Sequence, residues 1–151
     1  MIASGRNGGT WTGTGLTSTA AKNDSAASTA LGYMEASTYK SIFGDSALFN
    51  GESIHRTAVV IRHSYYGDAD LDGGVSINDF KSLSTSFGAT SRSLQDGHFD
   101  YDDGVSINHF NLLSSNFGKT LPVAASHPAV KKGVAPAMVK RGDSHFLLVR
   151  P

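Results

Sequence analysis

The sequence contains no cysteine among its 151 residues. This absence excludes a disulfide-stapled mini-domain, a thiolate zinc finger and a cysteine nucleophile. It does not fix the redox compartment, because exported proteins without cysteine also exist. No apolar run approaches the about 18 residues of a membrane helix, so we expect no membrane span. The first residues lack a charged stretch that leads into an apolar one, and we expect no signal peptide in this chain.

Charged side chains are also scarce, at 17%, and the 13 basic and 13 acidic residues cancel. Zero net charge argues against nucleic-acid binding. The charges are nevertheless segregated: residues 1–66 carry +1, residues 67–118 carry −6 and residues 119–151 carry +5. Like charges at short spacing repel one another, so the acidic middle segment requires a bound cation or full solvation.

The middle segment is a tandem repeat with a period of 30 residues. Residues 67–88 and 97–118 are identical at 13 of 22 aligned positions, including the pentapeptide GVSIN and the closing Phe-Gly. Two copies are too few for a solenoid. We therefore expect a paired module in which each copy covers the apolar face of the other.

The first copy contains the calcium-loop pattern D-x-D-x-D-G, which we call loop one (residues 68–79). Gly73 permits the sharp turn that this pattern needs, and Val75 is expected to pair with the other loop in a short strand-like contact. Calcium takes six to eight oxygen ligands. We expect these from Asp68, Asp70, Asp72, the carbonyl of Gly74, Ser76 and Asp79. The alternative is an Asp-rich turn without metal.

Loop two (residues 98–109) departs from this pattern at its coordinating positions. His98 and His109 replace the first and last carboxylates, and Asp103 replaces the turn glycine, while Asp100, Asp102 and Ser106 remain. Imidazole is a poor calcium ligand, so we expect weak or absent calcium binding, in a loop kept for its shape. A second hypothesis is a zinc-type or nickel-type site, since imidazole suits those ions. The ligands would be His98, Asp100, Asp102 and His109.

Each loop is followed by an apolar stripe at helical spacing. The stripes predict two helices of about three turns, ended by Gly88 and Gly118 as C-cap glycines. We expect the apolar residues of both stripes to pack in the core. They are Ile77, Phe80, Leu83 and Phe87 in the first copy, and Ile107, Phe110, Leu113 and Phe117 in the second.

A calcium loop followed by a single helix, given twice, resembles a dockerin, the calcium-binding module of cellulosomal and related secreted bacterial enzymes. The resemblance covers residues 65–119, and is strongest to modules that end large exported proteins of planctomycete-type bacteria. The segments YYGDADLDG (65–73) and NFG (116–118) carry it. It implies a secreted or cell-surface location. The substitutions at His98, Asp103 and His109 depart from the family pattern.

The resemblance also implies a partner. Dockerins bind cohesins through the tenth and eleventh loop positions and the helices, so a cohesin-like protein is the expected partner. The corresponding residues here are Ile77, Asn78, Ile107 and Asn108, with Lys81 and Leu112 on the helices. Because the copies are nearly equivalent there, two binding orientations are open. The alternative places Ile77 and Ile107 in the core.

The flanks complete an expected α+β fold with three parts. Residues 1–64 form a Gly-, Ser- and Thr-rich β segment, interpreted as the end of a larger β domain, with strands at TALGYMEA (29–36) and TAVVIRHSYY (57–66). Residues 65–119 form the duplicated module, and residues 120–151 an extended basic tail. We expect Trp11 to pack against the strands; a sugar-stacking role is the alternative.

Three functions remain open at this stage. The first is a calcium-binding docking or anchoring module, with a polysaccharide-degrading parent protein. The second is a structural calcium-stabilised end domain. The third is the C-terminal fragment of a glycoside hydrolase or another polysaccharide-acting enzyme. Glu35 and Glu52 lie in separate segments and no Ser/His/Asp order stands out, so we expect no enzymatic activity in this chain.

Overall fold

The computed structural model describes residues 1–90, 93–101 and 104–122. These residues form both helices and strands, which confirms the α+β class. The elements, in chain order, are α1 (Ile2–Arg6), η1 (Asn7–Gly9), α2 (Thr19–Asn23), β1 (Thr29–Glu35), α3 (Ala36–Phe43), β2 (Leu48–Phe49), β3 (Glu52–Ser53), β4 (Val59–Tyr65), α4 (Ile77–Ser86), η2 (Leu94–Asp96) and α5 (Ile107–Asn116).

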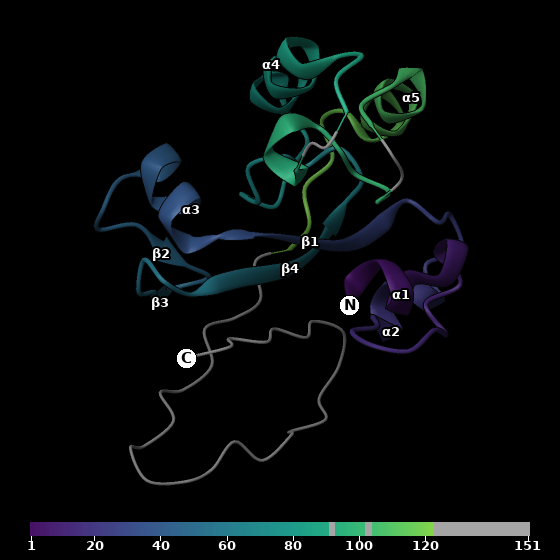
Figure 1. Ribbon diagram of the computed structural model, residues 1–151, viewed down its shortest axis with the longest axis horizontal. Helices are drawn as coiled ribbons and strands as arrows, with labels where there is room; N and C mark the ends of the chain where they lie inside the picture. Colours follow the sequence, from purple (N-terminus) through teal and green to yellow (C-terminus); the bar gives the residue numbers. More distant parts are fainter. Residues whose placement is uncertain (91–92, 102–103, 123–151) are drawn as a thin grey trace, which may run out of the picture.

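A long antiparallel pair of strands runs through the middle of the molecule (Figure 1). Strands β1 and β4 pair over their full length, with Thr29 opposite Tyr65 and Glu35 opposite Val59. Both strands lie where the sequence predicts them, because their β-branched and aromatic residues fit a pleated surface. The short strands β2 and β3 form a separate hairpin. Helices α4 and α5 lie on one side of the β1–β4 pair.

The N-terminal segment is less β-rich than expected. It contains the three helices α1, α2 and α3, of five, five and eight residues. The first two span little more than one turn, which is too short to produce a readable hydrophobic period. Ser18 supports α2 by accepting a hydrogen bond from the Ala21 N–H. Trp11 is buried in the hydrophobic core, at 3% exposed, and so offers no open face to a sugar.

The two repeats fold into matching loop–helix units. Helices α4 and α5 are each ten residues long. Both begin with a serine whose hydroxyl accepts a hydrogen bond from a backbone N–H of the first turn, at 3.2 and 3.3 Å. Gly88 and Gly118 follow the helices with φ of 79° and 80°, which confirms them as C-terminal glycines in the left-handed region.

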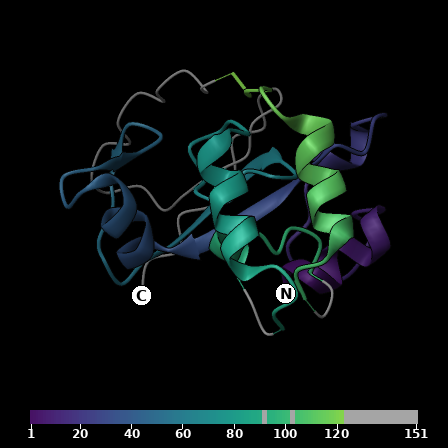
Figure 2. The same cartoon turned by 90° about the horizontal axis from the view of Figure 1, so that it is seen from above.

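Each loop pairs with the segment that follows the helix of the other repeat. The Val75 N–H donates to the Lys119 carbonyl (2.9 Å), and the Gly118 N–H donates to the Val75 carbonyl (2.8 Å). Val105 pairs in the same way with residues 88–89. The expectation that Val75 pairs with loop two is therefore wrong. The exchange places the start of each helix beside the end of the other, so α4 and α5 run antiparallel, side by side (Figure 2).

The first glycine of each repeat packs against the helix of the other repeat. A Cβ atom at Gly67 would lie 2.9 Å from Leu113 Cα, and one at Gly97 would lie 2.7 Å from Leu83 Cα. Both glycines also have positive φ, of 109° and 88°. The expected pair, in which each copy covers the other, is thus built by reciprocal backbone-to-helix contacts that only glycine permits.

The N-terminal segment and the repeats share one hydrophobic core. A Cβ atom at Gly32 of β1 would lie 2.5 Å from Leu71 Cδ2 and 2.9 Å from Leu94 Cδ2. The repeats also reach past residue 119, because the Leu121 N–H donates to the Gly73 carbonyl (2.9 Å). The division of the chain at residue 64 stays a prediction. The rest of the basic tail, residues 123–151, lies outside the described residues.

Asn116 links the last helix to the N-terminal segment. Its Nδ2 donates to the Tyr66 carbonyl (2.9 Å) and to the Ser28 carbonyl (3.2 Å), and the residue is 2% exposed. We expect Asn116→Ala to leave the buried Tyr66 carbonyl without this donor, whereas the Ser28 carbonyl keeps the Tyr66 N–H (2.9 Å). The free energy of unfolding should fall by about 1–3 kcal/mol in urea titrations. The control is Asn111→Ala on an exposed position of α5, which should change it by less than about 0.5 kcal/mol. Equal effects of both variants would contradict this role.

Candidate metal centre and the helical face beside it

Loop one brings three carboxylates to one point. Each of Asp68, Asp70 and Asp79 offers an oxygen, and these oxygens lie within 4.8 Å of one another. The three residues are 1%, 9% and 0% exposed. Acidic residues are rarely buried so completely unless they are paired or bind a metal. Asp72, the fourth predicted carboxylate, is exposed and lies outside this cluster.

Backbone N–H groups hold the carboxylate of Asp79 in place. Its Oδ1 accepts from the Ala69 N–H and its Oδ2 from the Ser76 N–H, both at 2.7 Å. The Ser76 hydroxyl also donates to Asp79 Oδ2 (3.0 Å) and therefore belongs to the cap of α4. Gly74 donates its N–H to Asp72 Oδ1 (2.8 Å). Metal contacts from the Gly74 carbonyl and the Ser76 hydroxyl stay predictions.

Gly73 makes the predicted sharp turn, with φ of 99°. The space at this position is also limited, because a Cβ atom there would lie 2.3 Å from Arg62 Nη2 and the guanidinium group would have to shift. Arg62 lies on β4 and is 6% exposed. Its Nη1 donates a hydrogen bond to the Leu71 carbonyl of loop one (2.9 Å). Arg62 was not among the predicted site residues. Its place inside a predicted strand was the available signal, since a cation on a buried strand face needs a polar partner.

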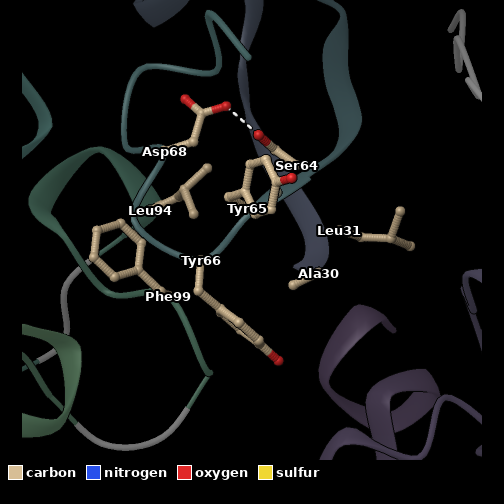
Figure 3. A pocket seen from close by; sticks show the side chains of 9 residues that line it. Ala30, Leu31, Ser64, Tyr65, Tyr66, Asp68, Leu94 and Phe99 are labelled. Carbon is tan, nitrogen blue, oxygen red and sulfur yellow. Dashed lines mark hydrogen bonds between the residues drawn. The ribbon is translucent and has the colours of Figure 1, made fainter. Parts of the chain in front are cut away.

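The Asp68 carboxylate has one satisfied oxygen and one unsatisfied oxygen. Oδ2 accepts from the Gly73 N–H (3.0 Å) and from the Ser64 hydroxyl (Figure 3). Oδ1 is buried and has no hydrogen-bond partner among the described residues. Leu94 and Phe99 lie around the same pocket and offer no polar side-chain atom. A buried oxygen without a partner carries a large desolvation penalty, which a bound cation would remove.

Burial raises the pKa values of this cluster. The pKa of Asp68 rises to about 7 and that of Asp70 to about 6, first through desolvation and then through repulsion from the neighbouring carboxylates. Desolvation also raises the pKa of Asp79, although N–H donors from the loop oppose the shift. Without a cation, the loop therefore holds protons that it must release to bind one.

This arrangement fits a hard divalent cation. All three converging donors are carboxylate oxygens, the ligands that calcium and magnesium prefer. The loop backbone is already shaped by its own N–H donors, so the carboxylates need no rearrangement to face one another. The cluster can hold a metal ion, and its donors suit calcium.

Loop two keeps the same geometry with different donors. His98, Asp100 and His109 each offer one ligand atom, and these atoms also lie within 4.8 Å of one another. Tyr101 and its counterpart Leu71 in loop one have φ of 64° and 60°, so the two loops share a left-handed backbone at this position. Asp102 and Asp103 lie outside the described residues. The predicted ligand Ser106 caps α5, and a metal contact from its hydroxyl stays a prediction.

The apolar stripes of α4 and α5 are only partly buried. Leu83 and Leu113 are buried at 1% exposed, as expected. Core packing is wrong for four other stripe residues, which are 53–57% exposed: Ile77, Phe87, Ile107 and Phe117. It is also wrong for Phe110, which is 36% exposed. The N-terminal segment covers other parts of the repeats through Gly32 and Asn116, so these four side chains remain at the surface.

Exposed apolar side chains therefore lie on both helices. The rings of Phe80 and Phe110 meet edge to face, with centroids 6.3 Å apart, and join the two helices. We define the apolar face as these two residues together with Ile77, Phe87, Ile107 and Phe117. Of the other predicted partner residues, Asn78, Lys81 and Asn108 are exposed, whereas Leu112 is half-buried against the core.

Comparison with protein-family models, with curated proteins and with solved structures found no significant match. Among the described residues, no helix has the length and apolar character needed to cross a bilayer.

The raised pKa values predict the pH dependence of the metal-free protein. Between about pH 4 and 7 the folded state binds more protons than the unfolded state, because the pKa values of Asp68 and Asp70 are raised to about 7 and about 6. Stability is therefore present at low pH and lost as the pH rises through these values. In EDTA we expect a higher Tm at pH 5 than at pH 7.5, measured by circular dichroism.

The control for this prediction is Asp68→Asn, which cannot ionise. It should flatten the decrease in Tm between the two pH values. A Tm that rises from pH 5 to pH 7.5 in EDTA, or the same slope in Asp68→Asn, would contradict the assignment.

Proposed function

We propose that this chain is a calcium-dependent docking module of an exported bacterial protein, similar to a dockerin. The main support for the proposal is the location of the apolar face. It lies on α4 and α5, the two helices that directly follow the loops. Loop one leads directly into α4, and its Val75 is hydrogen-bonded to the segment after α5. A cation in loop one would therefore fix both helices, and the apolar face with them.

Calcium is the ion best supported for loop one. The cluster offers only oxygen donors, and Asp68 Oδ1 is a buried acceptor without a partner among the described residues. Divalent charge would offset the repulsion among Asp68, Asp70 and Asp79. We propose one bound calcium, in loop one, since the imidazoles of loop two are poor ligands for it.

A protein partner is supported by the chemistry of the apolar face. Exposed aromatic and aliphatic residues that form a contiguous patch mark interaction sites more often than isolated exposed residues do. The patch repeats itself, because Ile77 and Phe87 on one helix correspond to Ile107 and Phe117 on the other. We propose a cohesin-like protein as the partner, with Asn78, Lys81 and Asn108 at the polar margin.

The exposed face also separates this proposal from a structural calcium staple. A module that only stabilised the end of a protein would gain by covering Ile77, Phe87, Ile107 and Phe117. Their exposure of 53–57% favours docking. A secreted location and a polysaccharide-degrading parent protein belong to the same proposal, and the chemistry of such a parent would lie outside this module.

Removal of two carboxylates of loop one tests the calcium site. We expect Asp68→Ala combined with Asp72→Ala to abolish calcium binding in isothermal titration calorimetry, while the wild-type chain binds one calcium. Adding EDTA to the wild type should lower its Tm and helical signal, because metal binding is coupled to folding of the loops. The matched control is Asp45→Ala together with Glu52→Ala in the N-terminal segment, which should keep the calcium heat. Unchanged heat in the Asp68 and Asp72 variant would refute the site.

Polar substitution of the apolar face tests docking separately. We expect Ile77→Ser with Ile107→Ser to retain calcium binding but to weaken capture of a cohesin by at least about tenfold, since two exposed anchors are lost. The measurement is surface plasmon resonance against a panel of immobilised cohesins, in calcium and in EDTA. The control is Leu48→Ser on β2, which is similarly exposed at 53%.

Two outcomes would contradict calcium-dependent docking. One is capture that is equally strong in EDTA. The other is the absence of capture by every cohesin in the panel while calcium binding is intact, which would leave the structural staple as the better account.

A further inference from the structure

Loop two retains the coordinating geometry of loop one but has exchanged its chemistry. The clustered residues of loop one, Asp68, Asp70 and Asp79, occupy loop positions 1, 3 and 12. The clustered residues of loop two, His98, Asp100 and His109, occupy the same three positions. If loop two had only lost its calcium site by random substitution, there would be no reason for both the first and the last ligand position to carry histidine, a metal-binding residue.

The ligand atoms of loop two are close enough to share one ion. They lie within 4.8 Å of one another, and His109 Nε2 lies 2.9 Å from Asp100 Oδ1. The His98 and His109 rings are also adjacent, with centroids 5.3 Å apart. Four-coordinate zinc with bonds of about 2.0–2.1 Å separates its ligand atoms by roughly 3.3 Å. Asp100 and His109 would have to part by only a few tenths of an ångström.

These donors do not fit calcium. Calcium requires six to eight oxygens, whereas two of the three clustered residues here offer nitrogen. Two imidazoles and one carboxylate are instead a common ligand set for zinc and related divalent ions. Such sites often add a water as the fourth ligand. His98 and Asp100 are only half-buried, so both remain partly accessible to solvent.

The surroundings of His109 fix its ring. The residue is 0% exposed, and its Nδ1 accepts a hydrogen bond from the Ser106 N–H at 3.2 Å, which directs Nε2 toward Asp100. Coordination through Nε2 requires the proton to reside on Nδ1. The Ser106 hydroxyl, 3.4 Å from Nδ1, is positioned to accept that proton in a hydrogen bond. Metal binding would thus move the His109 proton from Nε2 to Nδ1, and the hydrogen bond from the Ser106 N–H would be replaced by one from Nδ1 to the Ser106 hydroxyl.

We propose that loop two binds a divalent transition ion, with zinc as its physiological representative, through His98, Asp100 and His109. The two loops of one module then hold two different metals, calcium in loop one and zinc in loop two. Zinc in loop two would fix the junction between the end of α4 and the start of α5, because Val105 pairs with residues 88–89.

The test is zinc titration of the full chain in saturating calcium, so that loop one is filled. Isothermal titration calorimetry should give one zinc per chain, and cobalt used as a probe should give the intense visible bands of four-coordinate cobalt. We expect His98→Asp with His109→Asp, which restores the donors of loop one, to weaken zinc binding by about 100-fold or more. The same variant should bind a second calcium.

Two further measurements keep the test decisive. His98→Ala changes a half-buried residue that does not cap a helix, and it should lose zinc affinity even if the double variant fails to fold. His55→Ala removes an exposed histidine elsewhere and should bind zinc like the wild type. Nitrogen-15 NMR of the histidines should show the proton of His109 moving from Nε2 to Nδ1 when zinc is added.

The proposal is overturned if the folded wild type binds no zinc in the presence of calcium. It is also overturned if His98→Ala and His55→Ala bind zinc with equal affinity, or if zinc leaves the proton of His109 on Nε2. Each of these results would leave the Asp100–His109 contact as a metal-free brace of the loop.

Discussion

Repulsion among three buried carboxylates is the constraint on which this structure depends. Asp68, Asp70 and Asp79 face one another in loop one with almost no exposure to water. Backbone N–H groups satisfy most of their oxygens, but Asp68 Oδ1 is left without a partner among the described residues. A single calcium would reduce the charge of residues 67–118 from −6 to about −4 and would occupy the point where the three oxygens converge.

Loop one is joined by several contacts to the helices that carry the apolar face. Gly67 packs on Leu113 of the other repeat, and Val75 pairs with residues 118–119 beyond α5. Strand β4 contributes as well, because its residues Arg62 and Ser64 donate hydrogen bonds to loop one. Loop one therefore contacts the helices of both repeats as well as the N-terminal segment. A calcium ion bound in loop one would therefore be physically coupled to the position of the apolar face.

The elements that the sequence predicts correctly are those determined by neighbouring residues along the chain. The helices α4 and α5, their closing glycines and the strands β1 and β4 follow from periodicity, capping and β-branched composition. The exchanged pairing of Val75 depends on contacts 44 residues along the chain and leaves no local signal. The exposure of Ile77 and Phe117 could not be predicted locally either. An apolar stripe at helical spacing shows which residues lie on one face of a helix, but not whether another part of the chain covers that face. The three aspartates of the cluster were predicted, whereas Arg62 and Ser64 were not, since they lie in a strand outside the repeat.

The most direct test of the coupling between buried carboxylates and calcium is a crystal structure of the full chain grown with calcium, with anomalous diffraction to locate the ion. The account predicts one calcium peak in loop one, contacted by Asp68, Asp70 and Asp79, with Asp68 Oδ1 among its ligands. An ordered loop one without a peak, or a calcium bound through loop two instead, would contradict it.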